Sequence, residues 1–200
     1  STSAPAPATD TATDEAATRQ AYTECVSGLF PTQADAQTRA AACSKALQSR
    51  QLKPDEIALA RLTRGIARTA SGDKALAGED YIEAVQRYDW LIDPNNPESL
   101  ALYRRAVSLD ASGQTDKAME DYSAAIKADP KSSLAFLGRG VLLAVRKRAY
   151  DRAIEDFDKV LVIEPDNVGA LVSRGDGFGQ LGELGRAMAD LNRAVALAPD

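Results

Sequence analysis

Small and large apolar residues recur along the chain at spacings that suit packed helices. Four alanines are each followed, one helical turn later, by a large apolar residue: Ala77 by Tyr81, Ala118 by Tyr122, Ala153 by Phe157, and Ala187 by Leu191. Further small residues stand upstream of each pair, at Gly65, Ala106, Gly140 and Gly175. Prolines then follow at Pro94, Pro130, Pro165 and Pro199, and proline disfavours helical geometry in the residue before it. The pattern predicts repeated pairs of closely packed helices.

These signals predict an all-α fold of ten helices. Eight belong to the repeating units, at about 55–70, 73–92, 97–111, 115–128, 133–147, 150–163, 168–181 and 184–197. Two precede them, at about 15–29 and 34–49, with a turn at residues 30–32. We expect N-caps at Asn96, Ser132 and Asn167, the first of them followed by a proline at the first helical position.

The segment LVSRGDGFGQLGELGRAMADLNRAVALAP, residues 171–199, combines these small, large and proline positions at a spacing that resembles the tetratricopeptide repeat (TPR), a helix-turn-helix unit. The resemblance covers about residues 58–200, in units of about 55–95, 96–131, 132–166 and 167–200. The first unit is irregular, and the third has one extra residue near Arg148. The resemblance implies a right-handed TPR solenoid of about four helical hairpins, preceded by an N-terminal helical hairpin at residues 15–54.

In this family, function usually resides in a groove lined by the first helix of each repeat. The helical period places a mainly aliphatic row on that face: Leu59, Leu62, Ile66, Leu100, Tyr103, Val107, Asp110, Leu134, Leu137, Val141, Val145, Val172 and Asp176. Some of these residues must belong to the core between helices. The row lacks the Lys and Asn clamp of chaperone-binding TPR domains. We therefore expect it to bind an apolar or amphipathic segment of a partner protein or peptide.

An arginine and an aspartate recur together in all four units. The pairs are Arg64 with Asp80, Arg105 with Asp121, Arg139 with Asp156, and Arg174 with Asp190, separated by 16, 16, 17 and 16 residues. An arginine can bond a carboxylate through two parallel contacts, so one interpretation is a structural ion pair that sets the register of each hairpin. The alternative is a row of arginines that captures an acidic peptide. The aspartate beside every arginine argues against it.

Trp90 and the C-terminal helix are two further candidate contacts. Trp90 can anchor a partner, or it can be a core residue that covers the N-terminal helices. No polar helix follows the last repeat, so Leu184, Met188, Leu191 and Val195 can be uncovered and favour self-association. A shortened chain would explain this equally well. A structural subunit of a larger complex, held through its ends or convex face, is the second hypothesis for function.

Charge and composition narrow the functional class. The formal net charge of −5 disfavours a nucleic-acid partner, because such binding draws on concentrated Lys and Arg. The chain has no histidine, and neither a nucleophile with a base nor a calcium-type loop is present. We therefore expect no catalysis, no cofactor and no metal. No apolar run is long enough to span a bilayer, so we expect no direct membrane insertion.

The N-terminal region bears on localisation. Residues 1–14 are rich in Ala, Pro and Thr and contain no large apolar residue, which predicts a disordered tether or a plain disordered tail. Cys25 and Cys43, the only cysteines, fall on consecutive helices. They can form a disulfide, which implies an oxidising compartment, or remain two buried thiols. A tether and a disulfide together favour a periplasmic or envelope-associated protein, with lipid anchoring in front of residue 1 as one form of attachment.

Overall fold

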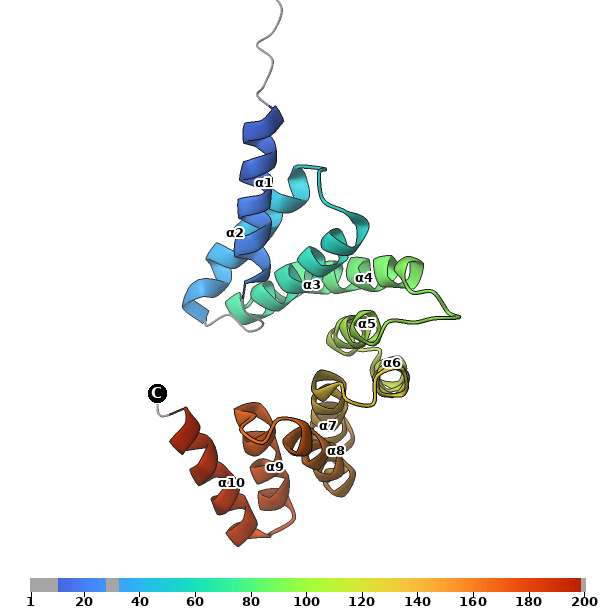
Figure 1. Cartoon of the computed structure of the whole chain (residues 1–200). Helices are drawn as coiled ribbons and strands as arrows, with labels where there is room; N and C mark the ends of the chain where they lie inside the picture. Colours follow the sequence, from blue (N-terminus) through green and yellow to red (C-terminus); the bar gives the residue numbers. More distant parts are fainter. Residues whose placement is uncertain (1–10, 28–32, 199–200) are drawn as a thin grey trace, which may run out of the picture. The chain divides into compact units, whose positions relative to one another are not determined.

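The computed structural model describes residues 11–27 and 33–198. These residues form ten helices and no strand, which confirms the predicted all-α fold (Figure 1). The helices are α1 (Thr11–Val26), α2 (Gln33–Gln48), α3 (Pro54–Ser71), α4 (Lys74–Leu91), α5 (Ser99–Ala111), α6 (Thr115–Ala128), α7 (Ser133–Lys147), α8 (Tyr150–Ile163), α9 (Val168–Gln180) and α10 (Leu184–Leu197).

Helix α1 is the element whose bounds differ most from the prediction. It begins at Thr11 instead of about residue 15, so residues 11–14 belong to the helix and not to the predicted tether. Asp14 lies in the first turn, where the helix dipole favours a negative charge. Residues 1–10, which make up the rest of the predicted tether, and the turn predicted at residues 30–32 lie outside the described residues.

The predicted N-cap at Asn96 is wrong. Helix α5 begins two residues later than predicted, with Glu98 at the N-cap position. The Asp93 carboxylate accepts a hydrogen bond from the Asn95 backbone N–H at 2.8 Å, and the Asp93 carbonyl accepts one from the Asn96 N–H at 3.2 Å. This local turn, in which an Asp side chain substitutes for a backbone acceptor, keeps Asn96 outside the helix. Ser132 caps α7 as predicted.

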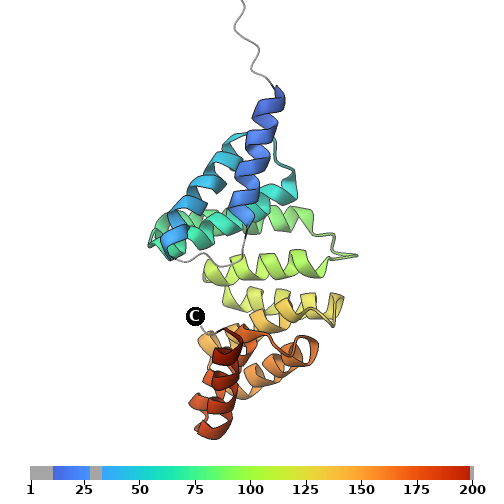
Figure 2. The ribbon, with the colours of Figure 1, turned by 60° about the vertical axis from the view of Figure 1, so that its left-hand side comes forward.

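The chain divides into two compact units, residues 1–91 and 92–200. In the first unit, α2 packs against α1 and α3, α3 pairs with α4, and α1 also contacts α3. The N-terminal pair therefore packs on α3 as a preceding hairpin would. In the second unit, α5–α6, α7–α8 and α9–α10 are hairpins, and the first helices α5, α7 and α9 are successive neighbours (Figure 2). The boundary separates the first predicted repeat from the other three.

Glycines allow the two helices of a hairpin to approach closely. A Cβ atom at Gly65 would lie 2.7 Å from the Tyr81 ring, and one at Gly140 would lie 2.6 Å from the Phe157 ring. A Cβ atom at Gly175 on α9 would lie 3.0 Å from the Leu191 side chain on α10. These distances are shorter than ordinary van der Waals contacts, and side chains in a packed core cannot shift to relieve them without strain. Each glycine therefore leaves the space that its large partner fills.

The turn inside the α7–α8 hairpin has an unusual residue. The corresponding turns of the other three repeats carry a glycine with positive φ, at Gly72, Gly113 and Gly182. The α7–α8 turn has Arg148 there, with φ 51° and ψ 31°. This left-handed conformation is unfavourable for a residue with a Cβ atom. Arg148 is also where the sequence predicted one extra residue.

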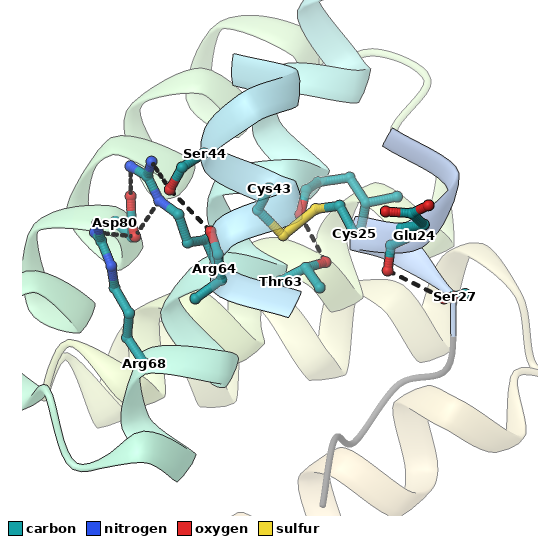
Figure 3. The surroundings of a disulfide bond; sticks show 11 residues. Glu24, Cys25, Ser27, Cys43, Ser44, Thr63, Arg64, Arg68 and Asp80 are labelled. Atoms are coloured by element: carbon teal, nitrogen blue, oxygen red, sulfur yellow. Dashed lines mark hydrogen bonds and ion pairs between the residues drawn. A yellow bond between two sulfur atoms is a disulfide. The ribbon is translucent and has the colours of Figure 1, made fainter. Parts of the chain in front are cut away.

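Cys25 and Cys43 form a disulfide between α1 and α2 (Figure 3). Their Cα atoms are 4.6 Å apart, and both residues are fully buried. Ala46, Leu52 and Ala60 belong to the same core cluster, which joins α1 and α2 to α3. The structure thus has the bonded form, not two unpaired thiols. The crosslink lies at the centre of the packing of the N-terminal pair.

Candidate functional site

The four arginine–aspartate pairs are in contact, each inside one hairpin. Every arginine donates from Nε to one carboxylate oxygen and from Nη2 to the other, over N–O distances of 2.6–2.8 Å. The four aspartates are at most 7% exposed. Hydrogen bonding to Asp156 raises the pKa of Arg139, and hydrogen bonding to Asp190 raises that of Arg174. Each guanidinium is therefore occupied by a buried carboxylate and does not offer a free row of charge to an acidic ligand.

Three of these arginines also bind the preceding hairpin, a role that the sequence interpretation missed. Each donates from Nη1 to a polar side chain on the second helix of the hairpin before it. The bonds join Arg64 to Ser44 at 3.1 Å, Arg139 to Ser123 at 3.2 Å, and Arg174 to Asp158 at 2.6 Å. Ser123 and Asp158 each stand two residues after a paired aspartate, a signal present in the sequence. The arginines therefore connect successive hairpins as well as the two helices of one hairpin.

Asp80 is surrounded by three arginines of α3. Besides the bonds from Arg64, its carboxylate accepts bonds from Nη1 of Arg61 at 3.1 Å and from Nη1 of Arg68 at 2.6 Å (Figure 3 shows Arg64 and Arg68). The arginines are spaced by three and four residues and share one helix face. Glu83 lies 2.9 Å from Arg61 and supplies a second negative charge. Asp80 itself is fully buried.

The pair Arg139–Asp156 provides a test of the structural role. We expect Arg139→Ala and Asp156→Ala each to destabilise the protein, because each single change leaves the other charge buried without its partner. The double variant should show a coupling energy of about 1–3 kcal/mol. Urea unfolding followed by circular dichroism would measure it. The more exposed pair Arg146–Asp110 is the control, with an expected coupling below about 1 kcal/mol. Additive effects at Arg139 and Asp156 would contradict the structural role.

The predicted groove residues divide into exposed and packed ones. Asp176 is exposed, and Leu100, Val141 and Val172 are 39–43% exposed. Tyr103, Val107, Leu134 and Leu137 are only partly exposed. Leu137 packs against two core clusters, and the Tyr103 ring lies 6.0 Å from that of Tyr122. The packed residues flank the core, so only part of the predicted row can reach a ligand directly.

A hollow of about 280 Å³ lies along α7 and α9 of the second unit. Its apolar lining comes from Val141, Ala144 and Val145 on α7 and from Phe157 on α8. Its polar lining consists of Arg148, Tyr150, Ser173, Asp176 and Gln180. The sequence interpretation predicted Val141, Val145 and Asp176 for this face and missed the turn residue Arg148. Helical projection could not place Arg148, because it lies just beyond the end of α7.

Trp90 is 77% exposed, so its interpretation as a core residue over the N-terminal helices is wrong. Tyr88 and Val85, close to Trp90 on the same helix, are buried, at 2% and 9% exposure. Helix α4 turns these two residues inward, and Trp90 falls outside the buried face. Trp90 instead lines a hollow of about 610 Å³ in the first unit, together with Pro54, Glu83, Gln86, Arg87 and Leu91.

The outer face of α10 is uncovered. Leu184, Met188 and Val195 are 64–66% exposed, and Leu191 is 36% exposed. In the preceding hairpin Ile154, which corresponds to Met188, packs against Phe178 of the next helix. The equivalent face of α10 is exposed in the described part of the chain.

The described part of the chain contains neither a membrane-spanning helix nor a cluster suited to metal. No helix among the described residues is both long enough and apolar enough to cross a bilayer. Nowhere in residues 11–27 and 33–198 do three His, Cys, Asp or Glu residues converge on a possible ion site.

Comparison with known families identifies the repeat. A model of the tetratricopeptide repeat matches residues 62–133, 103–168 and 141–200. The chain belongs to the tetratricopeptide-repeat family. Proteins of this family mediate protein–protein interactions. The overlapping TPR matches extend from residue 62 to residue 200 and therefore leave out α1 and α2.

Individual TPR proteins resemble the chain over different lengths. Small glutamine-rich tetratricopeptide repeat-containing protein 2 of Mycosarcoma maydis is 33% identical over 98 residues, which cover 49% of this chain and 28% of that protein. The chain thus spans just over a quarter of that relative. The solved structure of MamA from Desulfovibrio magneticus RS-1, from residue 41 to its end, has a TM-score of 0.55 and 16% identity, over 92% of this chain and 94% of the solved chain. YrrB has a TM-score of 0.51 and 18% identity, over 83% and 79%. These two structures share the TPR fold.

Proposed function

We propose that this chain is a noncatalytic protein-interaction module that binds an apolar or amphipathic segment of a partner through the first helices of its second unit. The observation that carries the proposal is the hollow along α7 and α9, whose floor includes Val141 and Val145 at 40% and 66% exposure. Exposed aliphatic side chains grouped in a concave surface with a polar rim mark a binding site more often than scattered ones do.

The shape of this surface suits a peptide or a helix. A partner segment with apolar residues along one face can cover Val141, Ala144 and Val145 while its polar face stays near the rim. YrrB, which shares the fold, is described as a TPR protein with an unusual peptide-binding site. That description supports peptide binding by a protein of this fold, and the residues that we propose for it here are those of the α7–α9 hollow.

The test uses a peptide selected on the wild-type protein from a random display library. We expect Val141→Asp and Val145→Asp each to weaken its binding at least about tenfold, because each would bury a carboxylate against an apolar ligand. Fluorescence anisotropy would measure the affinity, and circular dichroism would show retained helicity. Val162→Asp is the matched control: Val162 is 79% exposed on α8 and does not line the hollow. Leu137 is unsuitable, since it packs into the core.

A structural subunit held through another surface is the second candidate. Exposure of Trp90 beside the hollow formed with Pro54 and Arg87 favours it, because tryptophan is enriched at binding hot spots. Binding of the partner that survives Val141→Asp and Val145→Asp but is lost in Trp90→Ala would move the contact to the first unit.

We also propose that the protein works in an oxidising compartment, such as the bacterial periplasm or envelope. The buried disulfide Cys25–Cys43 supports this, because disulfides persist outside the reducing cytosol. Thiol trapping in intact cells would test it: a chain with two alkylated cysteines in its native host would overturn the proposal. A lipid anchor before residue 1 remains part of the same proposal.

A further inference from the structure

We infer that Arg148 and Asp176 give the α7–α9 hollow a charge preference, so that it selects a peptide with an acidic side chain next to an aliphatic one. The inference rests on the proposed function and names the class of ligand. The aliphatic side chain would cover Val141 and Val145, the carboxylate would face Arg148 at the turn, and a donor group would face Asp176 on α9.

Arg148 is the cation available at this end of the hollow. It is the last of three successive cations, and the first two have acidic partners: Arg146 lies 3.1 Å from Asp110, and Lys147 lies 2.6 Å from Asp116. Arg148 lines the hollow and has no ion-pair partner among the described residues. Its charge is therefore not neutralised within the described part of the protein.

The residue with positive φ in the α7–α8 turn differs from that of every other repeat turn. The remaining three turns use glycine for the left-handed conformation, whereas Arg148 adopts φ 51° with a side chain. A non-glycine residue in this region is disfavoured, and such residues cluster where they serve a ligand. Here the disfavoured conformation places a cationic side chain on the rim of the hollow.

Polar groups on α9 are also free to meet a ligand. Ser173, Asp176 and Gln180 line the hollow, and none of them hydrogen bonds to another side chain or to a carbonyl within the described residues. By contrast, Ser108 and Ser123 each donate to the carbonyl four residues earlier. The hollow thus combines an aliphatic floor, one cation and one anion, which is complementary to a mixed apolar and charged segment.

The experiment selects peptides from a random display library on the wild-type protein and on Arg148→Gln. We expect wild-type peptides to be enriched in Asp or Glu beside Leu, Ile, Val or Met, and peptides selected on Arg148→Gln to lose the acidic enrichment. For a selected peptide, Arg148→Gln should weaken binding about tenfold, the size of a lost charge-assisted hydrogen bond. The peptide with Glu replaced by Gln should bind both proteins equally.

Two variants control for charge and folding. Arg152→Gln removes the same charge from an exposed position on α8 that does not line the hollow, so its affinity should change less than about twofold. Arg148→Gly should weaken binding like Arg148→Gln while raising the midpoint of urea unfolding, because glycine relieves the left-handed backbone. Weaker binding by a more stable protein cannot arise from unfolding.

The outcomes separate the inference from the proposed function. Peptides that depend on Val141 and Val145 but lack acidic residues, or that bind Arg148→Gln as tightly as wild type, would overturn the charge preference alone. Failure to select any peptide sensitive to Val141→Asp and Val145→Asp would overturn the proposed function and the inference together.

Discussion

Asp80→Ala is expected to lower the free energy of unfolding by about 3–5 kcal/mol, as expected when one partner of a buried ion network is removed. Asp80 is fully buried and accepts hydrogen bonds from Arg61, Arg64 and Arg68. Without its carboxylate, three guanidinium groups on one face of α3 would lose the negative charge that they share, while Arg61 would keep its ion pair with Glu83. Urea unfolding followed by circular dichroism at several protein concentrations would measure the loss.

The control for Asp80 is the equivalent aspartate of the last hairpin. Asp190→Ala removes the same side chain at a residue that is 7% exposed, but Arg174 keeps a second counter-charge because it also bonds Asp158 at 2.6 Å. We therefore expect a smaller loss than at Asp80. Equal losses at the two positions would mean that the extra arginines around Asp80 contribute nothing to the stability.

Removal of the disulfide should also have a large effect. The double variant Cys25→Ser, Cys43→Ser is expected to lose about 3 kcal/mol of unfolding free energy, the amount typical for a loop of 18 residues. The two sulfurs lie in the core that holds α1 and α2 on α3, so the loss should concentrate in the first unit. Chemical denaturation with and without reductant would measure it.

The double serine variant is itself the control for this measurement. Reductant should destabilise the wild type by a similar amount and leave the variant unchanged. Intact mass should confirm the redox state, since the oxidised wild type lacks the two hydrogens of the thiols. A wild type whose thiols become titratable with reductant while its stability stays constant would contradict the structural role of the bond.

The repeats were predictable because their signals are local. Prolines such as Pro130 end a helix through their own ring, and glycines such as Gly140 allow close approach at a fixed distance in sequence from Phe157. These constraints act within one hairpin, so the helix bounds follow from the sequence to within two residues for all helices except α1. Helix α5 begins two residues later than predicted because the Asp93 side chain accepts the hydrogen bond of the Asn95 backbone N–H.

From the sequence, the candidate site could be predicted only as one face of the first helices of the repeats. Helical periodicity places Leu137 and Val141 on the same side of α7, yet Leu137 packs into the core and Val141 is 40% exposed. The difference depends on where the neighbouring helix lies. The periodicity of a single helix does not determine that position. For the same reason, the exposure of Trp90 could not be decided in advance.

From its sequence alone, this chain is an array of TPR hairpins with a paired arginine and aspartate in each and a mainly aliphatic inner face. Short-range spacing determines these features, since residues one helical turn or one hairpin apart meet wherever the chain folds. Tertiary structure decided which groups remain available: it joined Arg146 and Lys147 to acids of another hairpin and left Arg148 lining the same hollow as Val145 and Asp176. Whether a side chain is free to contact a ligand depends on all the atoms around it, and only the packing of successive helices brings those atoms together.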